Sequence, residues 1–154
     1  MEWRRIHLGT GILERDARVL LVASRYPNHP NPLWNLPGGR QEPPETVAAT
    51  VVREFAEETG LAVSVGALAY VAESFDASTH TQFTNFAFRV AAGGTPRVAA
   101  GDLHAVECGW FPYDELRRRL VVAVVREPLL AHLGGSKQRY FGYGDPGITI
   151  QFAD

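Results

Sequence analysis

The pattern of apolar and polar positions changes its period along the chain, which predicts strands and helices interspersed with one another. Residues 6–25 contain two apolar runs around the turn-forming stretch 14–17, as expected of two strands joined by a turn. Residues 26–39 contain four Pro, three Asn and two Gly, so we expect a loop there. Residues 61–73 are strand-like, and Gly66 within them is compatible with a division into two short strands.

The second half of the chain continues the same mixed pattern. Residues 86–90 alternate apolar and other side chains, which is typical of a half-buried strand. Residues 106–120 predict a strand, a stop at Pro112 and a helix. We expect a further short helix over 126–135 and a final edge strand over 147–152. The predicted fold class is therefore α/β in the broad sense: an α+β mixed sheet with helices packed on it, rather than a doubly wound parallel sheet.

Residues 45–59 carry the clearest helical pattern. Pro44 suits the first helical turn, and Gly60 is a natural residue just past the C-terminus. Glu45 places negative charge near the positive end of the helix dipole. A broad apolar arc is expected to face the sheet, and it comprises Val47, Ala48, Val51, Val52, Phe55 and Ala56.

Three glutamates near the end of this helix break the local electrostatic rules. Glu54, Glu57 and Glu58 fall within roughly 100° of one another on the helical wheel. They repel one another, and the negative end of the helix dipole disfavours them further. No Lys or Arg lies three or four residues from Glu54 or Glu58, and Arg53 precedes Glu57 in the less favourable order. Such a violation is typical of a functional site, although a solvated acidic face is the plain alternative.

A divalent cation would reverse the sign of each of these repulsions. The cluster offers only carboxylates, and hard oxygen ligands favour magnesium, manganese or calcium over zinc. The preceding glycines allow close approach of the backbone, so the carbonyl of Gly38 is a further candidate ligand.

Composition narrows the class of protein. The 154 residues fit one domain, 1–154, and 45% apolar with 21% charged residues is typical of a globular chain. The net charge of -2 gives no strong signal for nucleic acid. The single cysteine gives no disulfide framework, and the longest apolar run, 120–125, is too short to span a membrane. The first ten residues lack the apolar core of a signal peptide, so we expect none. We expect a cytoplasmic protein with no membrane partner.

Residues 39–61 resemble the Nudix hydrolase family at every fixed position of its 23-residue box. The spacing is Gly, five residues, Glu, seven residues, Arg-Glu, an apolar residue, any residue, Glu-Glu, any residue, Gly and an apolar residue. The matching residues are Gly39, Glu45, Arg53, Glu54, Phe55, Glu57, Glu58, Gly60 and Leu61. The resemblance implies a Nudix-type alpha-beta-alpha sandwich with its loop and helix.

The resemblance also implies chemistry. Nudix enzymes are metal-dependent pyrophosphohydrolases that cleave the diphosphate linkage of a nucleoside diphosphate joined to another moiety, with Mg2+ or Mn2+ as the metal. It assigns the catalytic work to Arg53, Glu54 and Glu57, with Glu54 as candidate base for the attacking water and Arg53 orienting it. Glu45 is implied to be structural. The implied metal ligands are Gly38, Glu54, Glu57 and Glu58.

Residues outside the box have more than one interpretation. The family implies a further acid before a late strand, for which Glu107 and Asp102 are both candidates. As substrate-binding candidates we note Arg25, which suits a phosphate or a plain surface position, and Trp34, which suits a base or the core. Glu107 is a third candidate, and a solvated strand position is its alternative. Residues 136–147 suit packing of a C-terminal segment, a border of the substrate pocket or a homodimer contact.

Two other classes of function remain open at this level. The family resemblance favours an acid-anhydride hydrolase acting on a small nucleotide such as a nucleoside triphosphate or nucleotide sugar. A non-catalytic nucleotide-sensing Nudix module is the alternative, and a structural protein with a solvated acidic helix is the third. The sequence carries no marker that chooses the nucleotide.

Overall fold

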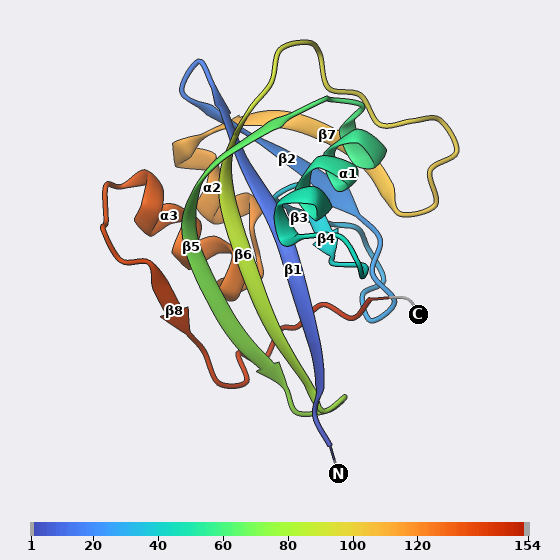
Figure 1. Cartoon of the computed structure of the whole chain (residues 1–154), viewed down its shortest axis with the longest axis vertical. Helices are drawn as coiled ribbons and strands as arrows, with labels where there is room; N and C mark the ends of the chain where they lie inside the picture. The colour runs from blue at the N-terminus through green and yellow to red at the C-terminus, as the bar shows by residue number, and fades with distance from the viewer. Residues whose placement is uncertain (1, 153–154) are drawn as a thin grey trace.

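A computed structural model describes residues 2–152 of the chain (Figure 1). Strands and helices are interspersed through the whole length, as predicted. Their order is β1 (Arg4–Arg15), β2 (Arg18–Ser24), β3 (Leu33–Asn35), β4 (Gly38–Arg40), α1 (Val47–Thr59), β5 (Ser64–Asp76), β6 (Thr81–Ala91), β7 (Ala105–Pro112), α2 (Tyr113–Arg119), α3 (Ala123–Leu133) and β8 (Tyr140–Gly142).

The long strand β1 belongs to both halves of the sheet. Most of β1 pairs in parallel with β6, whereas Glu14 and Arg15 at its end pair with β2. The order of strands is β3-β2-β1-β6-β5-β8, with β4 paired to β1 and β7 paired to β2. Because β1–β6 and β5–β8 are parallel and the other pairs are antiparallel, the sheet is mixed, which confirms the predicted class.

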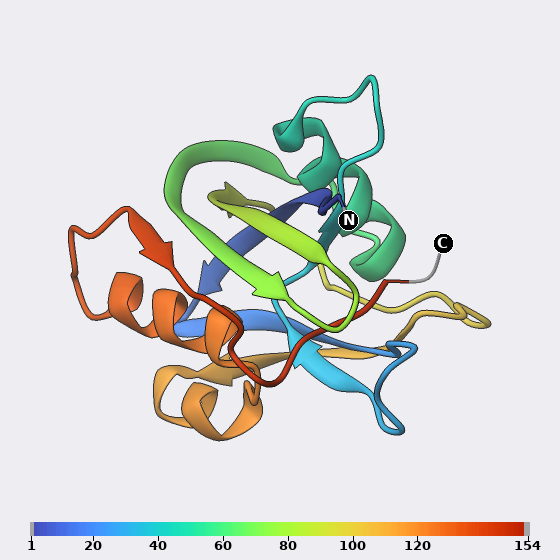
Figure 2. The same cartoon turned by 90° about the horizontal axis from the view of Figure 1, so that it is seen from below.

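Two apolar cores lie on opposite faces of the sheet, so that helices cover both faces (Figure 2). Neighbouring residues of a strand point to opposite faces, and β1 shows this directly. Ile12 joins the core that contains Leu116 of α2 and Leu129 of α3, while Leu13 joins the core that contains Phe55 of α1. This layering is the alpha-beta-alpha sandwich that the sequence predicted.

Helix α1 begins later than predicted and buries a different arc. The helix begins at Val47, Thr46 caps it, and the Oγ1 of Thr46 accepts a hydrogen bond of 3.1 Å from the amide of Ala49. Gly60 ends the helix in the left-handed region with φ of 72°, as predicted. The residues of α1 that are buried are Thr50, Val51, Phe55, Glu58 and Thr59. The expected apolar arc is therefore rotated, because Val52 and Ala56 are exposed while the acidic edge faces the protein.

Close packing of α1 on β1 depends on a glycine. A Cβ atom at Gly11 would lie 2.4 Å from the ring of Phe55, so no larger residue fits there without displacing the helix. This contact fixes how deeply the acidic edge of α1 sits against the sheet.

Three expectations need correction. The stretch 26–39 is not loop throughout, because β3 and the start of β4 lie within it. Strand β5 is continuous rather than divided, although its register with β6 shifts between Val65 and Leu68, close to Gly66. No strand forms over 147–152, because side chains of Asn28 and His29 bind its backbone in place of a neighbouring strand.

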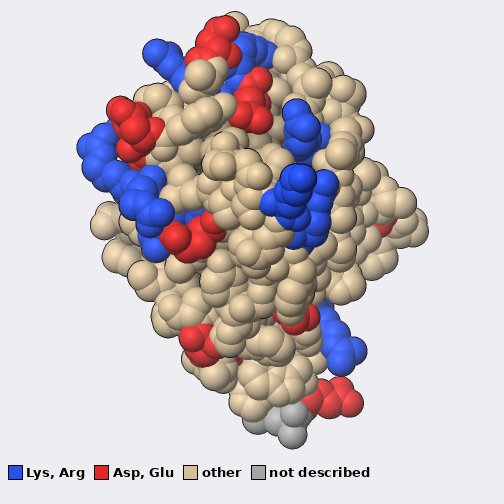
Figure 3. Space-filling view, turned by 90° about the vertical axis from the view of Figure 1, so that its left-hand side faces the viewer, with Lys and Arg blue, Asp and Glu red and all other residues tan. Residues whose placement is uncertain are grey.

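Charged groups on the face that carries α3 and β8 are mixed in sign (Figure 3). At α2 and α3 the ion pairs explain this: Arg117 lies 3.3 Å and Arg126 2.6 Å from the carboxylate of Glu127. Among residues 2–152, no helix is long and apolar enough to cross a lipid bilayer.

Candidate active site

Arg53 is the centre of an ion-pair network on α1. Its Nε and Nη2 donate to the two carboxylate oxygens of Glu45 at 3.0 and 2.7 Å. Its Nη1 donates to Glu54 at 3.0 Å and lies 3.4 Å from Glu57, and Nη2 also donates to the carbonyl of Arg40. The bidentate contact with Glu45 fixes the plane of the guanidinium, and this in turn positions Nη1, the nitrogen that donates to Glu54.

Glu45 ties the loop before α1 to the helix. Its carboxylate accepts from the amide of Glu42 at 3.0 Å and from the hydroxyl of Thr50 at 2.8 Å, besides Arg53. The hydrogen bond from Arg53 is the main cause that lowers the pKa of Glu45 to about 2. Glu45 thus stays ionised and holds Arg53 in place, in keeping with the structural role that the family resemblance implied.

Glu54 and Glu58 are the two acidic side chains that α1 turns inward. Only 14% of the Glu54 side chain is exposed, and Glu58 is 4% exposed. Burial, followed by the charge of Glu57, raises the pKa of Glu54 to about 7, although Arg53 opposes this. Burial also raises the pKa of Glu58 well above its ordinary value, and the nearby charge of Glu54 adds to this.

The glycines at the start of the box allow the backbone to reach these carboxylates. The amide of Gly38 donates to Oε1 of Glu58 at 2.8 Å. A Cβ atom at Gly39 would lie 2.5 Å from Oε1 of Glu54, so that glutamate rests directly on the glycine. Glu54 has Arg53 as its described partner and Glu58 has only the amide of Gly38, so placing the two carboxylates together is costly for the protein unless a metal cation joins them.

Glu57 differs from its two neighbours. Its side chain is 56% exposed, and its only described ion pair is the long contact with Arg53. Within residues 2–152, no three acidic, His or Cys side chains converge closely enough to hold a metal ion as they stand. Glu54 and Glu58 therefore face inward without a metal, while Glu57 lies on the solvent side of them.

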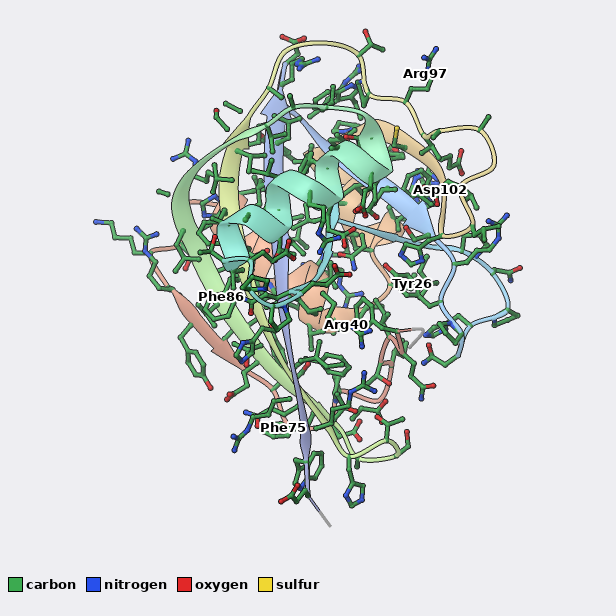
Figure 4. The ribbon with its side chains drawn as sticks, turned by 45° about the vertical axis from the view of Figure 1, so that its right-hand side comes forward. Tyr26, Arg40, Phe75, Phe86, Arg97 and Asp102 are labelled. Carbon is green, nitrogen blue, oxygen red and sulfur yellow. The ribbon has the colours of Figure 1, made fainter. Side chains whose placement is uncertain are left out.

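Two further side chains surround Glu58. Asp102 adds to the rise in the pKa of Glu58 and lies beyond the C-terminal end of α1 (Figure 4). Its Oδ1 accepts from the amides of His104 and Ala105, both at 2.8 Å, which fixes it in this position. Tyr26 is buried below the same end of α1, and burial together with the charges of Glu58 and Glu54 raises the pKa of its phenol.

A cavity of about 580 Å³, including space open to solvent, lies on the other side of β1 and β4. Thr10 lines it, and Thr10 is the register partner of Gly38, whose amide donates to Glu58, so the cavity and this carboxylate adjoin the same strand pair. Among the described residues that line the cavity, none is charged. Its polar residues are Thr10, Asn35, Ser74, Asn85 and Thr149.

Residues 5–133 match the family model described as the NUDIX domain. The chain belongs to the Nudix family. The helix α1 and the preceding strand β4 are thus its Nudix box, with the spacing that the sequence displayed. The membership confirms the resemblance.

Similar Nudix proteins differ in what they are named for. An ADP-ribose pyrophosphatase of Methanocaldococcus jannaschii is 36% identical over 107 residues, which is 69% of this chain and 61% of that protein. A CTP pyrophosphohydrolase of Escherichia coli is 36% identical over 63 residues, which is 41% of this chain and 47% of that protein. The chain spans about half the length of the curated relatives it matches. A MutT NUDIX hydrolase structure from Burkholderia pseudomallei has a TM-score of 0.71 and 31% identity, covering 82% of this chain and 96% of that one.

Trp34 on β3 and Glu107 on β7 both align with Ala23 of β2, but their surroundings differ. Arg25 is exposed, and its amide donates to the carbonyl of His104 at 2.8 Å. Trp34 packs against the core and meets the ring of Phe111 edge-on at 4.8 Å. Glu107 is exposed on β7, whereas the charge of its alternative Asp102 contributes to the raised pKa of Glu58.

Sequence reasoning missed the polar residues that line the cavity and the buried phenol of Tyr26. Asn35 directly follows Trp34 in a mostly apolar stretch before the box, and this polar residue was the signal in the sequence that could have pointed to the cavity. The spacing rule also missed the contact of Arg53 with Glu54, since adjacent helical residues are not expected to face each other.

The donor set of the Nudix box suits a hard divalent cation. Glu54 and Glu58 offer buried carboxylate oxygens with raised pKa values, and Glu58 has only the amide of Gly38 as a described hydrogen-bond donor. Carboxylate oxygens without sulfur or imidazole select magnesium or manganese rather than zinc.

Proposed function

We propose that this protein is a metal-dependent Nudix pyrophosphohydrolase that cleaves the diphosphate linkage of a small nucleotide by attack of water on phosphorus. The observation that carries the proposal is the buried pair Glu54 and Glu58 on the Nudix helix, next to the backbone of Gly38. Two inward-facing carboxylates with raised pKa values have no structural purpose that an apolar pair would not serve better.

The metal ligands we propose are the carboxylates of Glu54, Glu57 and Glu58 with the carbonyl of Gly38. Bound Mg2+ or Mn2+ would neutralise the diphosphate and lower the pKa of a water molecule there. Glu57 is exposed and held only by a contact of 3.4 Å with Arg53, so its side chain is free to turn toward the buried pair.

Glu54 is the residue we propose as general base. In the metal-free protein burial raises the pKa of Glu54 to about 7, so this inward-facing carboxylate can take up a proton near neutral pH. Arg53 donates to Oε1 of Glu54 at 3.0 Å and is itself fixed by Glu45, so the second carboxylate oxygen keeps a defined direction. Asp102, beside Glu58, is the further acid that we prefer over Glu107.

The uncharged cavity supports a nucleoside as the part of the substrate that is not phosphate. Its apolar walls suit a planar base, and amide groups suit the polar edge of one. The Oδ1 of Asn85 accepts from Thr10, which leaves its NH2 group as a donor for the base, whereas the side chain of Asn35 is engaged by the amide of Leu36 and the phenol of Tyr26.

A hydrolysis assay tests the proposal. The protein is mixed with Mg2+ and each of a panel of nucleotides that includes CTP and ADP-ribose, and nucleoside monophosphate and phosphate products are measured. We expect cleavage of at least one member, dependent on the metal. The variants Glu54→Gln and Glu57→Gln should lower kcat by a factor of about 100 or more.

Glu127→Gln is the matched control. Glu127 also follows an arginine directly and pairs with it, at 2.6 Å, but it lies on α3 and away from the box. It should retain the wild-type rate. Metal-dependent binding without cleavage of any nucleotide would instead identify a non-catalytic Nudix module, and equal activity of Glu54→Gln and Glu127→Gln would refute the site.

A further inference from the structure

The segment after β8 crosses one end of the sheet and lies beyond the residues that the family model matches, 5–133. Residues 143–152, here called the C-terminal strap, run from β8 under the β5–β6 hairpin toward the loop between β2 and β3 (Figure 2). The strap has no strand or helix of its own, so its position depends on specific contacts.

The β5–β6 hairpin holds the first part of the strap. The amide of Tyr143 donates to the carbonyl of Glu73 at 2.8 Å. The Oγ1 of Thr149 donates to Oδ2 of Asp76 at 3.0 Å, and Asp76 is almost fully buried. These contacts fix the strap against the floor of the cavity.

The β2–β3 loop holds the second part. The carbonyl of Thr149 accepts from Nδ2 of Asn28 and from Nε2 of His29, both at 2.7 Å. The amide of Gln151 donates to Oδ1 of Asn28 at 2.9 Å. One asparagine therefore satisfies both a donor and an acceptor of the strap backbone, as a neighbouring strand would.

The fixed strap forms one wall of the cavity. Ile150 and Phe152 line it together with Pro146 and Thr149, opposite the first residues of α3. The ring of Phe152 meets the rings of Tyr26 and Phe83 at 6.1 Å. Ile148, two residues before Ile150, does not line the cavity and is 46% exposed.

We infer that Ile150 and Phe152 of the C-terminal strap are specificity-determining residues, which set the base that the cavity accepts. The inference rests on the proposed function, because it assigns the cavity to the base of the nucleotide. The floor of the cavity belongs to the sheet and is rigid, so the distance between the strap and α3 decides which base fits. Asn28 maintains that distance from outside the cavity.

Equilibrium binding tests the inference without hydrolysis. Calorimetric titration with AMP, GMP, CMP and UMP gives four dissociation constants for the wild type, Ile150→Ala and the matched control Ile148→Ala. Removing the Ile150 side chain should weaken binding of the preferred nucleotide about tenfold. It should also narrow the range of the four dissociation constants about fivefold, since the loss of a few methylene groups from an apolar pocket lowers discrimination by at least this amount. Ile148→Ala should keep all four values within about twofold.

Two further variants protect the test. Ile150→Val, which conserves the fold, should narrow the range of the four dissociation constants by a smaller factor than Ile150→Ala. Asn28→Ala should narrow this range as Ile150→Ala does. Equal values for Ile150→Ala and Ile148→Ala would overturn the inference, as would a wild type that binds none of the four nucleotides. Loss of the proposed function has a different signature, namely selective binding with no cleavage of the corresponding triphosphates.

Discussion

Replacing Glu54 by glutamine should stabilise the metal-free protein at alkaline pH. Burial and Glu57 raise the pKa of Glu54 from the ordinary 4.5 to about 7, so the folded state binds its proton more tightly than the unfolded state does. The stability from this group is fully present below pH 4.5 and is lost as the pH rises through about 7. Glutamine cannot ionise, so the variant should lack this loss.

The size of the effect follows from the shift. One pKa unit corresponds to about 1.4 kcal/mol, so the shift from 4.5 to about 7 corresponds to about 3 kcal/mol of unfolding free energy at pH 8. For a chain of this length that is a rise in Tm of roughly 5–10 °C. At pH 4 the two proteins should have nearly equal stability, because both side chains are then neutral.

Urea denaturation followed by tryptophan fluorescence measures this difference. Wild type, Glu54→Gln and the control Glu127→Gln are unfolded in EDTA at pH 4, 6 and 8. The pKa of Glu127 is lowered by its hydrogen bond with Arg126, so the control should destabilise the protein slightly at pH 8. If Glu54→Gln were also less stable than the wild type at pH 8, the ionised Glu54 carboxylate would not destabilise the metal-free protein, and the prediction would be refuted.

The remaining predictions concern the metal, the ion-pair network and the packing of α1. Addition of Mg2+ at pH 8 should raise the Tm of the wild type and leave that of Glu54→Gln nearly unchanged, since a ligand that binds only the native state stabilises that state. Equal shifts in Tm for the two proteins would argue against this site. Arg53→Lys should lower the unfolding free energy by about 2 kcal/mol, because lysine cannot make the bidentate contact with Glu45, and a urea titration without such a loss would contradict that role. Gly11→Ala should lower the stability by about 1–3 kcal/mol through its clash with Phe55, whereas Gly93→Ala, with open space around it, should not; similar melting curves for both would refute the close packing.

The acidic cluster was predictable from the sequence because its geometry is local. Helical spacing places Glu54, Glu57 and Glu58 near one another whatever the rest of the chain does. The wheel does not say which arc faces the sheet, however. Contact with β1 through Gly11 and Phe55 rotates the helix so that Glu58 is buried and Glu54 mostly covered, while Glu57 is exposed.

Contacts between residues far apart in the chain were beyond such reasoning. The cavity is built from β1, β3, β5, β6, α3 and the strap, and Asn28 meets Thr149 across 121 positions. Likewise, the loop that carries Asp102 is placed beside Glu58 by its attachment to the end of α1, where the amide of Arg97 donates to the carbonyl of Thr59.

The sequence by itself determined the Nudix box, the mixed sheet and the carboxylates that we propose as metal ligands, since each depends on residue type and short-range period. Only the tertiary structure decided which carboxylates lose their water, and hence that the pKa of Glu54 rises to about 7. It also decided that a segment expected as an edge strand, 147–152, forms a wall of the cavity instead. Desolvation and cavity shape arise from several elements together, so no single stretch of sequence contains them.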